Sequence, residues 1–382
     1  MRIALFITSL HTGGSQRQVV ELVRALAASG QDVSLITVYP GGQLWNEATR
    51  LQDIQLLSLY SRRPATRIGR ALGVLGAPLG LRQITRALRF HIVYSMLDLS
   101  NLIARLALLG TRNGPTLAWG LRSSTRQADP RAVLPYALCR MLSGGVPLAI
   151  GNSHSSVEAY RDAGFRFPDA HVVHNGIDTD RFRFDAALRD QWRANLDIAD
   201  DSILVTLVGR IDGRKGHSDF ITMAQLLAER DARYRFACVG PGSVKSGRAL
   251  EGAIEKAGVE ARITVLGETE DMPGVYSASD IVVSASHSES FPNVVAEAMA
   301  CSRPVVATDV GDAAVLVGDC GTMVAAGDAS ALAHAVAWTA SEVATVHDAA
   351  RQRVVENFSV EALADRTRDV LFNALGTGKG AE

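Results

Sequence analysis

The stretch IVVSASHSESFPNVVAEAMA, residues 281–300, decides the fold because it describes a strand, a loop and a helix in succession. Residues 281–286 are apolar or small, which is typical of a strand buried on both faces of a parallel sheet. Pro292 begins the helical part, and the first turn of a helix is where proline is tolerated. Glu289 is therefore expected in the loop, and Glu297 about a turn and a half into the helix.

This junction carries groups that suit a nucleotide sugar. The backbone N–H groups of Asn293 and Val294 stand at the start of the helix, where N–H groups and the helix dipole attract phosphate. The carboxylates of Glu289 and Glu297 can accept hydrogen bonds from hydroxyl groups. Together these groups indicate a ligand made of two hydroxylated rings joined by a diphosphate.

Strands alternate with helices along the rest of the chain. The predicted strands are residues 3–8, 33–39, 91–95, 116–119, 147–151 and 171–174 in the first half, and 203–209, 236–240, 263–266, 281–286 and 304–308 in the second. This alternation predicts parallel sheets, and two such series predict two doubly wound α/β domains whose ligands bind beyond the carboxyl ends of the strands. We expect the domain boundary between residues 175 and 202.

Three helices have recognisable positions. Ser15 is placed to cap a helix that runs to Ala28, with Gln18 completing a capping box and Gly30 following its end. A helix over residues 186–196 is expected to lead into the second domain. A final amphipathic helix is predicted over residues 359–375, with residues 376–382 disordered after it.

The length and composition fit two domains. The chain has 382 residues, of which 47% are apolar, enough for a core in each half. The net charge of −1 hides an asymmetry, because residues 1–180 carry 19 Arg against 11 Asp and Glu, whereas residues 181–382 carry 20 Lys and Arg against 29 Asp and Glu.

Cysteine spacing and hydropathy bear on the expected compartment. The four cysteines (Cys139, Cys238, Cys301 and Cys320) show no metal-ligand spacing, so a reduced cytoplasmic setting is expected. The chain begins directly as a strand, without a signal-peptide pattern, and no apolar run reaches the ~18–20 residues that span a bilayer.

A basic turn, GRIDGRKGH at residues 209–217, follows a predicted strand and opens a helix at about Ser218. Arg210 and Lys215 can converge above the strand ends, where two cations suit a diphosphate that gains charge as it leaves. A solvated basic turn is the alternative, and the two glutamates of the neighbouring junction favour the ligand.

Glycines elsewhere carry weaker signals. Gly13 and Gly14 precede a helix, where they allow a ligand to approach the backbone. Gly240-Pro241-Gly242 ends another strand but lacks the third glycine of the dinucleotide fingerprint, which counts against a nicotinamide enzyme.

Taken together, these motifs resemble the family 4 retaining glycosyltransferases of the GT-B fold (group 1 glycosyl transferases). The resemblance covers nearly the whole chain and is strongest over residues 203–330. The matching patterns are E-x7-E at Glu289 and Glu297, G-R-x-x-x-x-K-G at 209–216, the pair Gly13 and Gly14, N-G-[VI]-D at 175–178, E-A-M-A at 297–300 and P-V-V-A-T-x-x-G at 304–311. The set is specific, although no single motif is.

The resemblance implies two Rossmann-like doubly wound domains facing a central cleft, and it assigns roles to residues. Arg210 and Lys215 should hold the diphosphate, Glu289 should contact the hydroxyls of the donor sugar, and Glu297 the ribose. The implied catalytic residues are Glu289, Arg210 and Lys215; the implied donor-binding residues are Gly13, Gly14, Arg210, Lys215, Leu266, Met272, Glu289, Phe291, Pro292, Asn293, Val294 and Glu297. Val275 or Tyr276 can also line the base pocket, with helix core as the alternative. No metal and no cofactor are implied, and a UDP-sugar is the expected donor.

The sequence departs from the family pattern in two places. The family often has a histidine after the strand near residue 119, close to the anomeric carbon; here Arg122 or Ser123 takes that place on the acceptor side. Ser302 stands where a glycine is usual, for which only a turn adjustment is expected.

Three histidines invite a catalytic interpretation. His154 is expected to be a cap-region residue and His174 a structural residue at the domain junction. His287 is the histidine nearest the sugar site, and contact with the donor is one of its two open interpretations. No residue is assigned as a covalent nucleophile.

Residues 54–128 are strongly basic, with eleven Arg and one acid, Asp98. Arg62, Arg63, Arg67 and Arg70 precede the apolar stretch 71–81, and Arg82, Arg86 and Arg89 follow it. Basic residues flanking an apolar stretch suit an anionic membrane surface, and a soluble acceptor cleft is the alternative. No nucleic-acid motif accompanies the charge.

Together with the resemblance, which implies retention, these observations predict a metal-independent, hexosyl-type transferase that moves a sugar from a nucleotide diphosphate to a lipid-linked or saccharide acceptor. We expect an acceptor-binding domain over residues 1–178, a donor-binding domain over 179–358 and a helix over 359–375 that packs back toward the first domain. The expected role is in cell-surface polysaccharide, lipopolysaccharide or glycolipid synthesis, at the inner face of the cell membrane. A non-catalytic nucleotide-sugar-binding subunit and a nucleotide-sugar epimerase are the alternatives.

Overall fold

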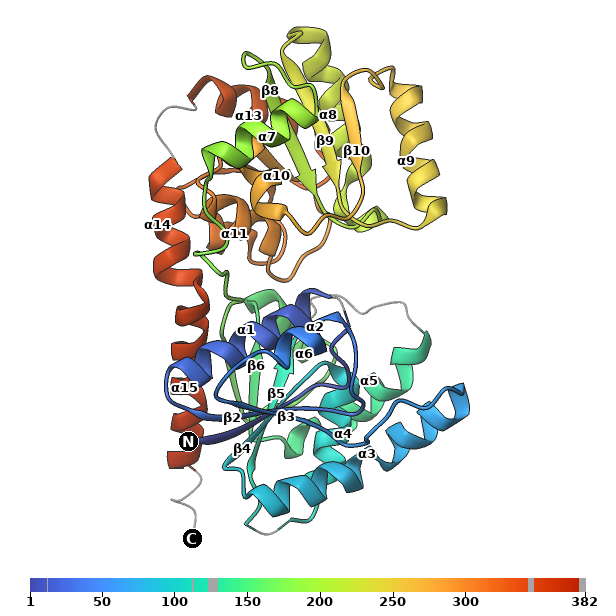
Figure 1. Cartoon of the computed structure of the whole chain (residues 1–382), viewed down its shortest axis with the longest axis vertical. Coiled ribbons are helices and arrows are strands. Elements are labelled where there is room, and N and C mark those ends of the chain that lie inside the picture. The colour runs from blue at the N-terminus through green and yellow to red at the C-terminus, as the bar shows by residue number, and fades with distance from the viewer. Residues whose placement is uncertain (12, 112, 123–129, 343–346, 378–382) are drawn as a thin grey trace. The chain divides into compact units, whose positions relative to one another are not determined.

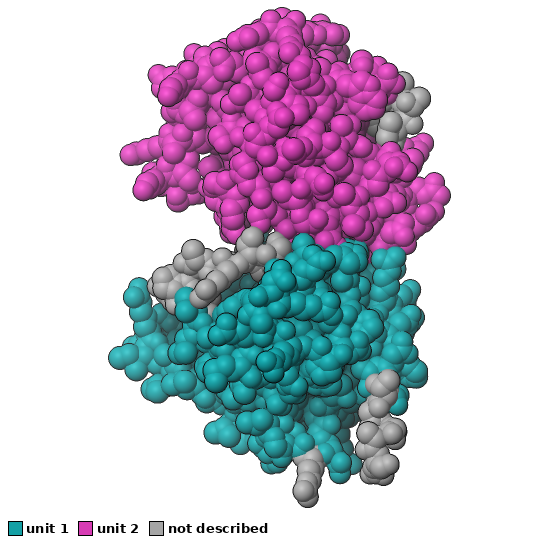
Figure 2. All heavy atoms as spheres, turned by 180° about the vertical axis from the view of Figure 1, so that it is seen from behind, with its two compact units in different colours: residues 1–176, 360–382 teal, residues 177–359 magenta. Residues whose placement is uncertain are grey.

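The computed structural model describes residues 1–11, 13–111, 113–122, 130–342 and 347–377 (Figure 1). The chain divides into two compact units, which Figure 2 distinguishes by colour. The first unit contains residues 1–176 and 360–382, and the second contains residues 177–359. In each unit, helices cover a parallel sheet, which confirms the predicted α/β class.

The first unit has a seven-stranded sheet within its described residues, in the order β3-β2-β1-β4-β5-β6-β7. Its strands are β1 (Arg2–Phe6), β2 (Asp32–Thr37), β3 (Ile54–Ser58), β4 (Ile92–Met96), β5 (Thr116–Leu121), β6 (Leu148–Gly151) and β7 (Asp169–Val172). Its helices are α1 (Gly14–Ala28), α2 (Gln43–Ala48), α3 (Arg67–Leu88), α4 (Asp98–Leu108), α5 (Pro130–Leu142), α6 (His154–Asp162) and α15 (Val360–Thr377), with a short 3-10 turn over Ser143–Gly145.

The second unit has a six-stranded sheet within its described residues, in the order β10-β9-β8-β11-β12-β13. Its strands are β8 (Ile203–Val208), β9 (Tyr234–Val239), β10 (Ile263–Leu266), β11 (Ile281–Ser284), β12 (Val305–Thr308) and β13 (Thr322–Val324). Its helices are α7 (Ala186–Asn195), α8 (His217–Arg230), α9 (Val244–Ala257), α10 (Met272–Ala278), α11 (Asn293–Ala300), α12 (Ala313–Val317), α13 (Ala329–Glu342) and α14 (His347–Phe358), with a 3-10 turn over Gly213–Lys215.

Two edge strands were not predicted. β3 is only half-buried and β13 has three residues, so neither shows the apolar run that marks the central strands. The strand predicted over residues 171–174 is shifted, because β7 occupies Asp169–Val172 and leaves His174 in the segment that follows the strand. The predicted helix and strand bounds elsewhere differ by a few residues at the ends.

The predicted capping box at the start of α1 is wrong. The N-cap residue is Gly13, and no side chain caps the helix. Gln18 is buried and uses its amide elsewhere: its Nε2 donates to the carbonyl oxygen of Gly176 at 2.8 Å, and its Oε1 accepts from the N–H of Gly176 at 2.9 Å. This pair of hydrogen bonds fixes the Asn175-Gly176 segment against α1, which gives the N-G motif a structural role within the first unit.

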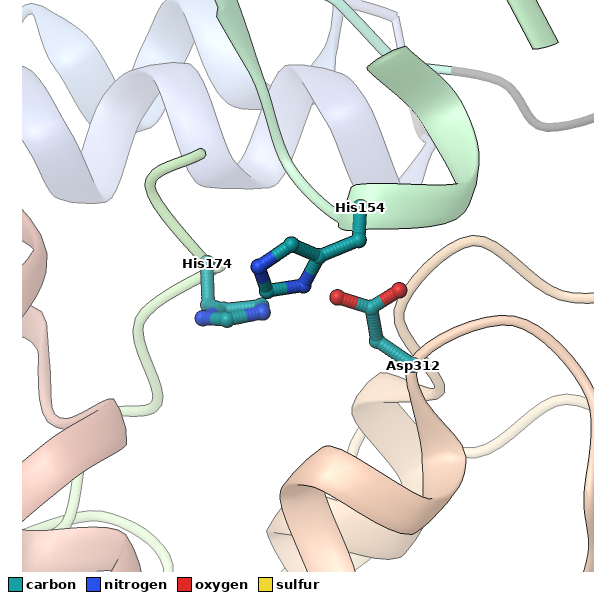
Figure 3. Close-up of side chains that lie close together, drawn as sticks. All are labelled: His154, His174 and Asp312. Atoms are coloured by element: carbon teal, nitrogen blue, oxygen red, sulfur yellow. The ribbon is translucent and has the colours of Figure 1, made fainter. Parts of the chain in front are cut away.

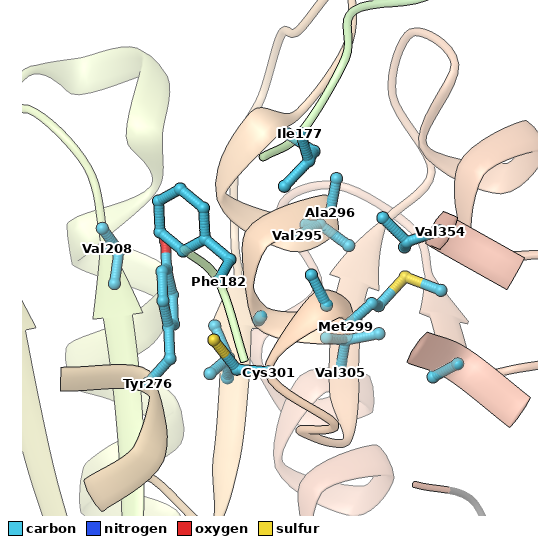
Figure 4. Packing of buried hydrophobic residues seen from close by; sticks show 14 of the residues in the cluster. Ile177, Phe182, Val208, Tyr276, Val295, Ala296, Met299, Cys301, Val305 and Val354 are labelled. Carbon is cyan, nitrogen blue, oxygen red and sulfur yellow. The ribbon is translucent and has the colours of Figure 1, made fainter. Parts of the chain in front are cut away.

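Separate cores hold each sheet and its helices. In the first unit, α15 packs against α1 and contributes Leu363 and Leu371 to the core cluster beneath it. In the second unit, α10 and α11 bury Tyr276 and Met299 against the sheet (Figure 4). The ring of Phe182 meets that of Tyr276 edge-on, with 6.0 Å between centroids. This packing gives the loops that precede α10 and α11 a rigid base.

Each of the four cysteines is free. Among the described residues, no helix combines the length and the apolar character needed to cross a membrane.

Candidate functional site

The E-x7-E junction and the basic turn lie at the centre of the second sheet. β8 and β11 are neighbours in the sheet and run parallel, so their following loops leave the same edge. The loop after β8 carries Arg210 and Lys215, and the loop after β11 carries Glu289. The topology therefore brings the two motifs together at the carboxyl edge of the sheet.

Lys215 and Glu289 form a direct ion pair between these loops, from Nζ to Oε1. Ser286 donates its hydroxyl to the same Oε1 at 2.7 Å. The side chains of Lys215 and Glu289 are 22% and 13% exposed, so water screens the pair only partly. The arrangement fixes one carboxylate and one ammonium side by side at the carboxyl edge of the sheet.

Two glycines allow the loops to pack this closely. Gly216 follows Lys215 with φ of +66°, and a Cβ there would overlap the carbonyl oxygen of Ala285 in the opposite loop. Gly311 has φ of +61°, and a Cβ there would overlap the carbonyl oxygen of Glu289. Any other residue at either position would be strained in its backbone and would also push the loops apart.

Arg210 does not join the pair. Its Nε donates to Asp212 at 2.9 Å, and its side chain is 60% exposed. Burial acts to raise the pKa of Asp212, but hydrogen bonds from Arg210 and Arg214 outweigh it and lower that pKa. Asp212 therefore stays ionised and holds two guanidinium groups in the turn after β8.

Glu297 lies in the fifth position of α11 and accepts a 2.7 Å hydrogen bond from the hydroxyl of Tyr276 at its Oε2. Tyr276 is fully buried; burial first, and the neighbouring charge of Glu297 second, raise its pKa well above the usual value. The phenol therefore remains protonated and donates, which orients the carboxylate. Of the two residues expected at the base pocket or in the core, Tyr276 and Val275 are both core residues.

The start of α11 differs in detail from the expectation. Pro292 is the N-cap, and the N–H of Asn293 donates to the carbonyl oxygen of Phe291 at 3.0 Å. Phe291 is buried with its ring 5.6 Å from that of Phe358. Val294 is partly buried against the same core, as are Leu266 and Met272 at the ends of their own elements. The N–H of Asn293 thus has a partner within the chain, so its assignment as a phosphate contact stays a prediction.

His287 is tied to the protein on two sides. Its backbone N–H donates to the carbonyl oxygen of Arg214 at 2.7 Å. Its ring atom Nε2 lies 3.4 Å from Oδ2 of Asp219 in the first turn of α8. These contacts link the loop before Glu289 to the helix that follows the basic turn. They give His287 a role in holding the loops together.

The first unit presents its own predicted residues at the carboxyl edge of its sheet. Gly13 and Gly14 begin α1, and Arg122 follows β5. His154 begins α6 directly after its N-cap, Ser153, as expected for a cap-region residue, and its ring centroid lies 5.6 Å from that of His174 (Figure 3). Ser123, the other acceptor-side candidate, lies outside the described residues.

The sequence alone did not indicate three of these contacts. Ser286 donates a hydrogen bond to Glu289, Gln18 exchanges hydrogen bonds with Gly176, and Asp219 lies beside His287. The only available signal was proximity, since Ser286 precedes Glu289 by three residues and a serine at that spacing can fold back on a loop carboxylate. The other two contacts join segments far apart in the chain.

Two family profiles match the chain on either side of the boundary between the units. Glycosyltransferase Family 4 matches residues 12–181, and Glycosyl transferases group 1 matches residues 202–342. Among curated proteins, D-inositol 3-phosphate glycosyltransferase of Rhodococcus opacus is 36% identical over 206 residues, which are 51% of this chain and 46% of that protein. The enzyme of the same name from Saccharomonospora viridis is 31% identical over 227 residues, 56% of this chain and 52% of that protein. The chain spans about half the length of the curated relatives it matches.

Solved structures share the fold over the whole chain. HepE of Anabaena in complex with UDP has a TM-score of 0.80 at 20% identity, covering 98% of this chain and 100% of that one. WaaG, a glycosyltransferase involved in lipopolysaccharide biosynthesis, has a TM-score of 0.68 at 17% identity, covering 99% and 100%. At these identities the likeness shows the fold alone, which is the GT-B arrangement of two Rossmann-like domains. With both profiles matched in the order that the sequence motifs predicted, the chain belongs to the family 4, group 1 glycosyltransferases.

Proposed function

We propose that this protein transfers a hexosyl group from a UDP-sugar to a hydroxyl acceptor, with retention of anomeric configuration and without a divalent ion. The donor is assigned to the second unit and the acceptor to the first. The observation that carries the proposal is the Lys215–Glu289 pair at the centre of the second sheet's carboxyl edge. Ligands of doubly wound sheets bind at this edge.

The pair suits the two halves of a glycosyl donor. The carboxylate of Glu289 is fixed by Ser286 and can accept hydrogen bonds from sugar hydroxyls. The ammonium of Lys215 and the guanidinium of Arg210 lie on one turn and can stabilise the charge that develops on the diphosphate as it leaves. Glu297, oriented by Tyr276, supplies a carboxylate for the ribose.

Names of similar proteins support the donor class. Solved structures with the same fold contain UDP and UDP-glucose. The curated relatives are named as glycosyltransferases acting on D-inositol 3-phosphate, and WaaG as acting in lipopolysaccharide biosynthesis. For this chain we propose a saccharide, sugar alcohol or lipid-linked acceptor of a cell-surface polymer or glycolipid.

A panel of nucleotide sugars tests the donor assignment. Purified full-length protein should be stabilised most by a UDP-sugar in thermal shift, and Lys215→Ala should lose that stabilisation. A shift of equal size in the variant would place the nucleotide elsewhere.

Release of UDP on adding an acceptor separates an enzyme from a binding subunit. Conversion of the free donor into another nucleotide sugar would identify an epimerase.

Transfer is expected to continue in excess chelator, because side-chain cations stabilise the leaving group in this proposal. The product should carry the same anomeric configuration as the donor, read from the coupling constant of the anomeric proton by NMR. The control is the same reaction with added Mg²⁺ or Mn²⁺. Activity that only a divalent ion restores would contradict the metal-independent assignment, and an inverted product would contradict retention.

We also propose that the first unit contacts an anionic membrane from the cytoplasmic side, through helix α3. Four of its large apolar side chains are exposed: Ile68 by 75%, Leu72 by 62%, Leu75 by 76% and Leu79 by 69%. Their spacing of four, three and four residues places them on one face of the helix, and we call this face the α3 stripe.

The surroundings of the α3 stripe are basic. Arg62, Arg63 and Arg67 are exposed before it, and Arg86 and Arg89 are exposed after it. The buried residues of the helix, Ala77, Leu81 and Thr85, lie on the opposite side. An exposed apolar face flanked by arginines, with no acid between residues 54 and 97, suits a helix lying in the plane of an anionic bilayer surface.

Vesicle sedimentation tests this contact. The protein should bind phosphatidylglycerol vesicles at low salt and phosphatidylcholine vesicles much less. Each basic residue contributes on the order of 1 kcal/mol near such a surface, so Arg62→Gln/Arg63→Gln/Arg67→Gln should weaken binding, and salt should weaken it further. Leu72→Gln/Leu75→Gln/Leu79→Gln should also weaken it.

A matched control removes the same charge elsewhere. Arg50, Arg183 and Arg248 are exposed outside the α3 region, and their triple change to Gln should leave vesicle binding near that of the wild type. Activity on a water-soluble acceptor should survive all three sets. The membrane assignment fails if the control variant weakens binding as much as the Arg62/Arg63/Arg67 variant does, or if no binding occurs at low salt. The arginines around the α3 stripe would then serve a soluble acceptor.

A further inference from the structure

Arg122 follows β5 at the carboxyl edge of the first unit's sheet, and neutral groups hold its guanidinium. Its Nη1 donates to Oδ1 of Asn175 at 2.9 Å. Its Nη2 donates to the hydroxyl of Tyr94 at 3.1 Å and faces the sulfur of Met96 at 3.4 Å. Its Nε is buried and has no hydrogen-bond partner in the described part of the chain. The side chain is half-buried and held on three sides.

No acid balances this charge within the described ranges. Its contacts with the described residues are the neutral ones above, and none of the ion pairs among those residues involves Arg122. Asp98, the acid that begins α4, instead accepts a 2.7 Å hydrogen bond from the hydroxyl of Tyr160. Burial raises the pKa of Tyr94 against the opposing effect of Arg122, so this phenol stays protonated at neutral pH and brings no negative charge.

An uncompensated cation in a half-buried position is costly, because desolvation is not repaid by a counter-charge. Arginine remains charged at any physiological pH, so it cannot relieve that cost by losing its proton. The position of Arg122 also indicates a ligand, because doubly wound parallel sheets bind ligands beyond the carboxyl ends of their strands. A guanidinium already oriented by Asn175 and Tyr94 loses little further entropy when it meets an anion.

Two imidazoles lie on the same edge of the sheet. Asn175, which orients Arg122, directly follows His174 in the chain, and the ring of His174 lies 5.6 Å from that of His154 (Figure 3). The edge formed after β5, β6 and β7 therefore combines a fixed guanidinium with two imidazoles.

We propose that Arg122 binds an anionic group, a phosphate or a carboxylate, on the hydroxyl acceptor. The acceptor class is then an anionic saccharide, sugar alcohol or lipid-linked saccharide. This inference rests on the proposed function, because it assumes that the first unit holds the acceptor. It assigns to Arg122 a role in choosing the acceptor, with donor binding left to the second unit.

Matched acceptors measure this role through UDP release. The sets are glucose, glucose 6-phosphate and glucuronate, and inositol with an inositol monophosphate. A charge-assisted contact supports a preference of at least ~10-fold in kcat/KM for an anionic member over its neutral partner. Arg122→Gln should remove this preference by raising KM for the anionic acceptor at least ~10-fold more than KM for its neutral partner, while KM for the donor stays within about twofold of the wild type.

Two further variants sharpen the result. Arg122→Lys keeps the charge and should restore part of the preference. Arg161 is exposed on α6 of the same unit, and Arg161→Gln should leave the preference intact. A phosphate-specific preference and a carboxylate-specific one identify which anion the site takes. Equal use of neutral and anionic acceptors by the wild type, an equal loss for both in Arg122→Gln, or a raised donor KM in that variant would each overturn the proposal.

A binding experiment separates this inference from the proposed function. Inorganic phosphate and acetate are titrated by calorimetry into the full-length protein saturated with UDP. The wild type should bind at least one of these anions, and Arg122→Gln should not. If no acceptor releases UDP but anion binding depends on Arg122, the proposed activity fails and the anion site stands. If neutral acceptors release UDP and anion binding is the same in both proteins, the activity stands and the Arg122 assignment fails.

Discussion

Replacing Lys215 by alanine is expected to lower sugar transfer by at least ~100-fold, and replacing Glu289 by alanine should do the same. In the proposed function, Lys215→Ala removes a contact with the departing diphosphate, and Glu289→Ala removes a contact with the donor sugar. Both losses act on groups that the fold holds in place, since Ser286 and Lys215 both bind Glu289. Steady-state UDP release with a saturating donor measures each effect.

The double variant distinguishes chemistry from structure. If Lys215 and Glu289 served only as an ion pair, removing both would relieve the penalty of leaving one charge unpaired. Lys215→Ala/Glu289→Ala is instead expected to remain as inactive as either single variant. Lys245→Ala and Glu251→Ala change exposed residues of α9 and should retain normal activity. Recovery of transfer in the double variant would show that the pair is structural.

Gly216→Ala is expected to damage both stability and activity, and Gly258→Ala is its matched control. Both glycines have nearly the same backbone conformation, with φ of +66° and ψ of +31° at Gly216 and φ of +68° and ψ of +31° at Gly258. A Cβ at Gly216 would overlap the carbonyl oxygen of Ala285, whereas a Cβ at Gly258 meets nothing within 4 Å.

Gly258→Ala should therefore show only the cost of the backbone conformation, a loss of about 1 kcal/mol in the free energy of unfolding. Gly216→Ala adds the steric overlap and should lose more than ~3 kcal/mol. Because the overlap displaces Lys215, transfer should fall by ~100-fold, as misplacement of a reacting group by about 1 Å can cost. Thermal unfolding and UDP release measure the two effects. Equal losses in the two variants would mean that the loops after β8 and β11 are not packed as the structure has them.

The sequence placed each of the two central loops at a carboxyl edge, because that placement depends only on order along the chain. Their contact depends in addition on β8 and β11 being neighbours in the sheet. A buried strand followed by a helix places its loop at the carboxyl edge, and Glu289 and Lys215 both occupy such loops. The α/β class followed from the same alternation. The edge strands β3 and β13 were not predicted, because they are only partly buried and their composition resembles that of a loop.

Contacts between distant segments could not be predicted in this way. Gln18 suits a capping box by spacing, but in the folded chain its amide binds Gly176, which is 158 residues away. The N–H of Asn293 stands at a helix start, yet the turn at Phe291 already supplies its partner. Arg210 shares a turn with Lys215, and the nearer carboxylate of Asp212 holds it instead. Each outcome depends on which polar group lies nearest after folding, and a motif does not contain that information.

A single NMR time course tests the central claim most directly. Purified full-length protein is mixed with UDP-glucose and the acceptor panel, and the anomeric protons of donor and product are followed together, with Lys215→Ala as the inactive control. We predict acceptor-dependent loss of the UDP-glucose signal, matched by a glycoside signal of the same configuration. An unchanged donor signal with every acceptor, from protein that binds UDP-glucose, would contradict the account, as would a donor signal that converts into another UDP-sugar without acceptor.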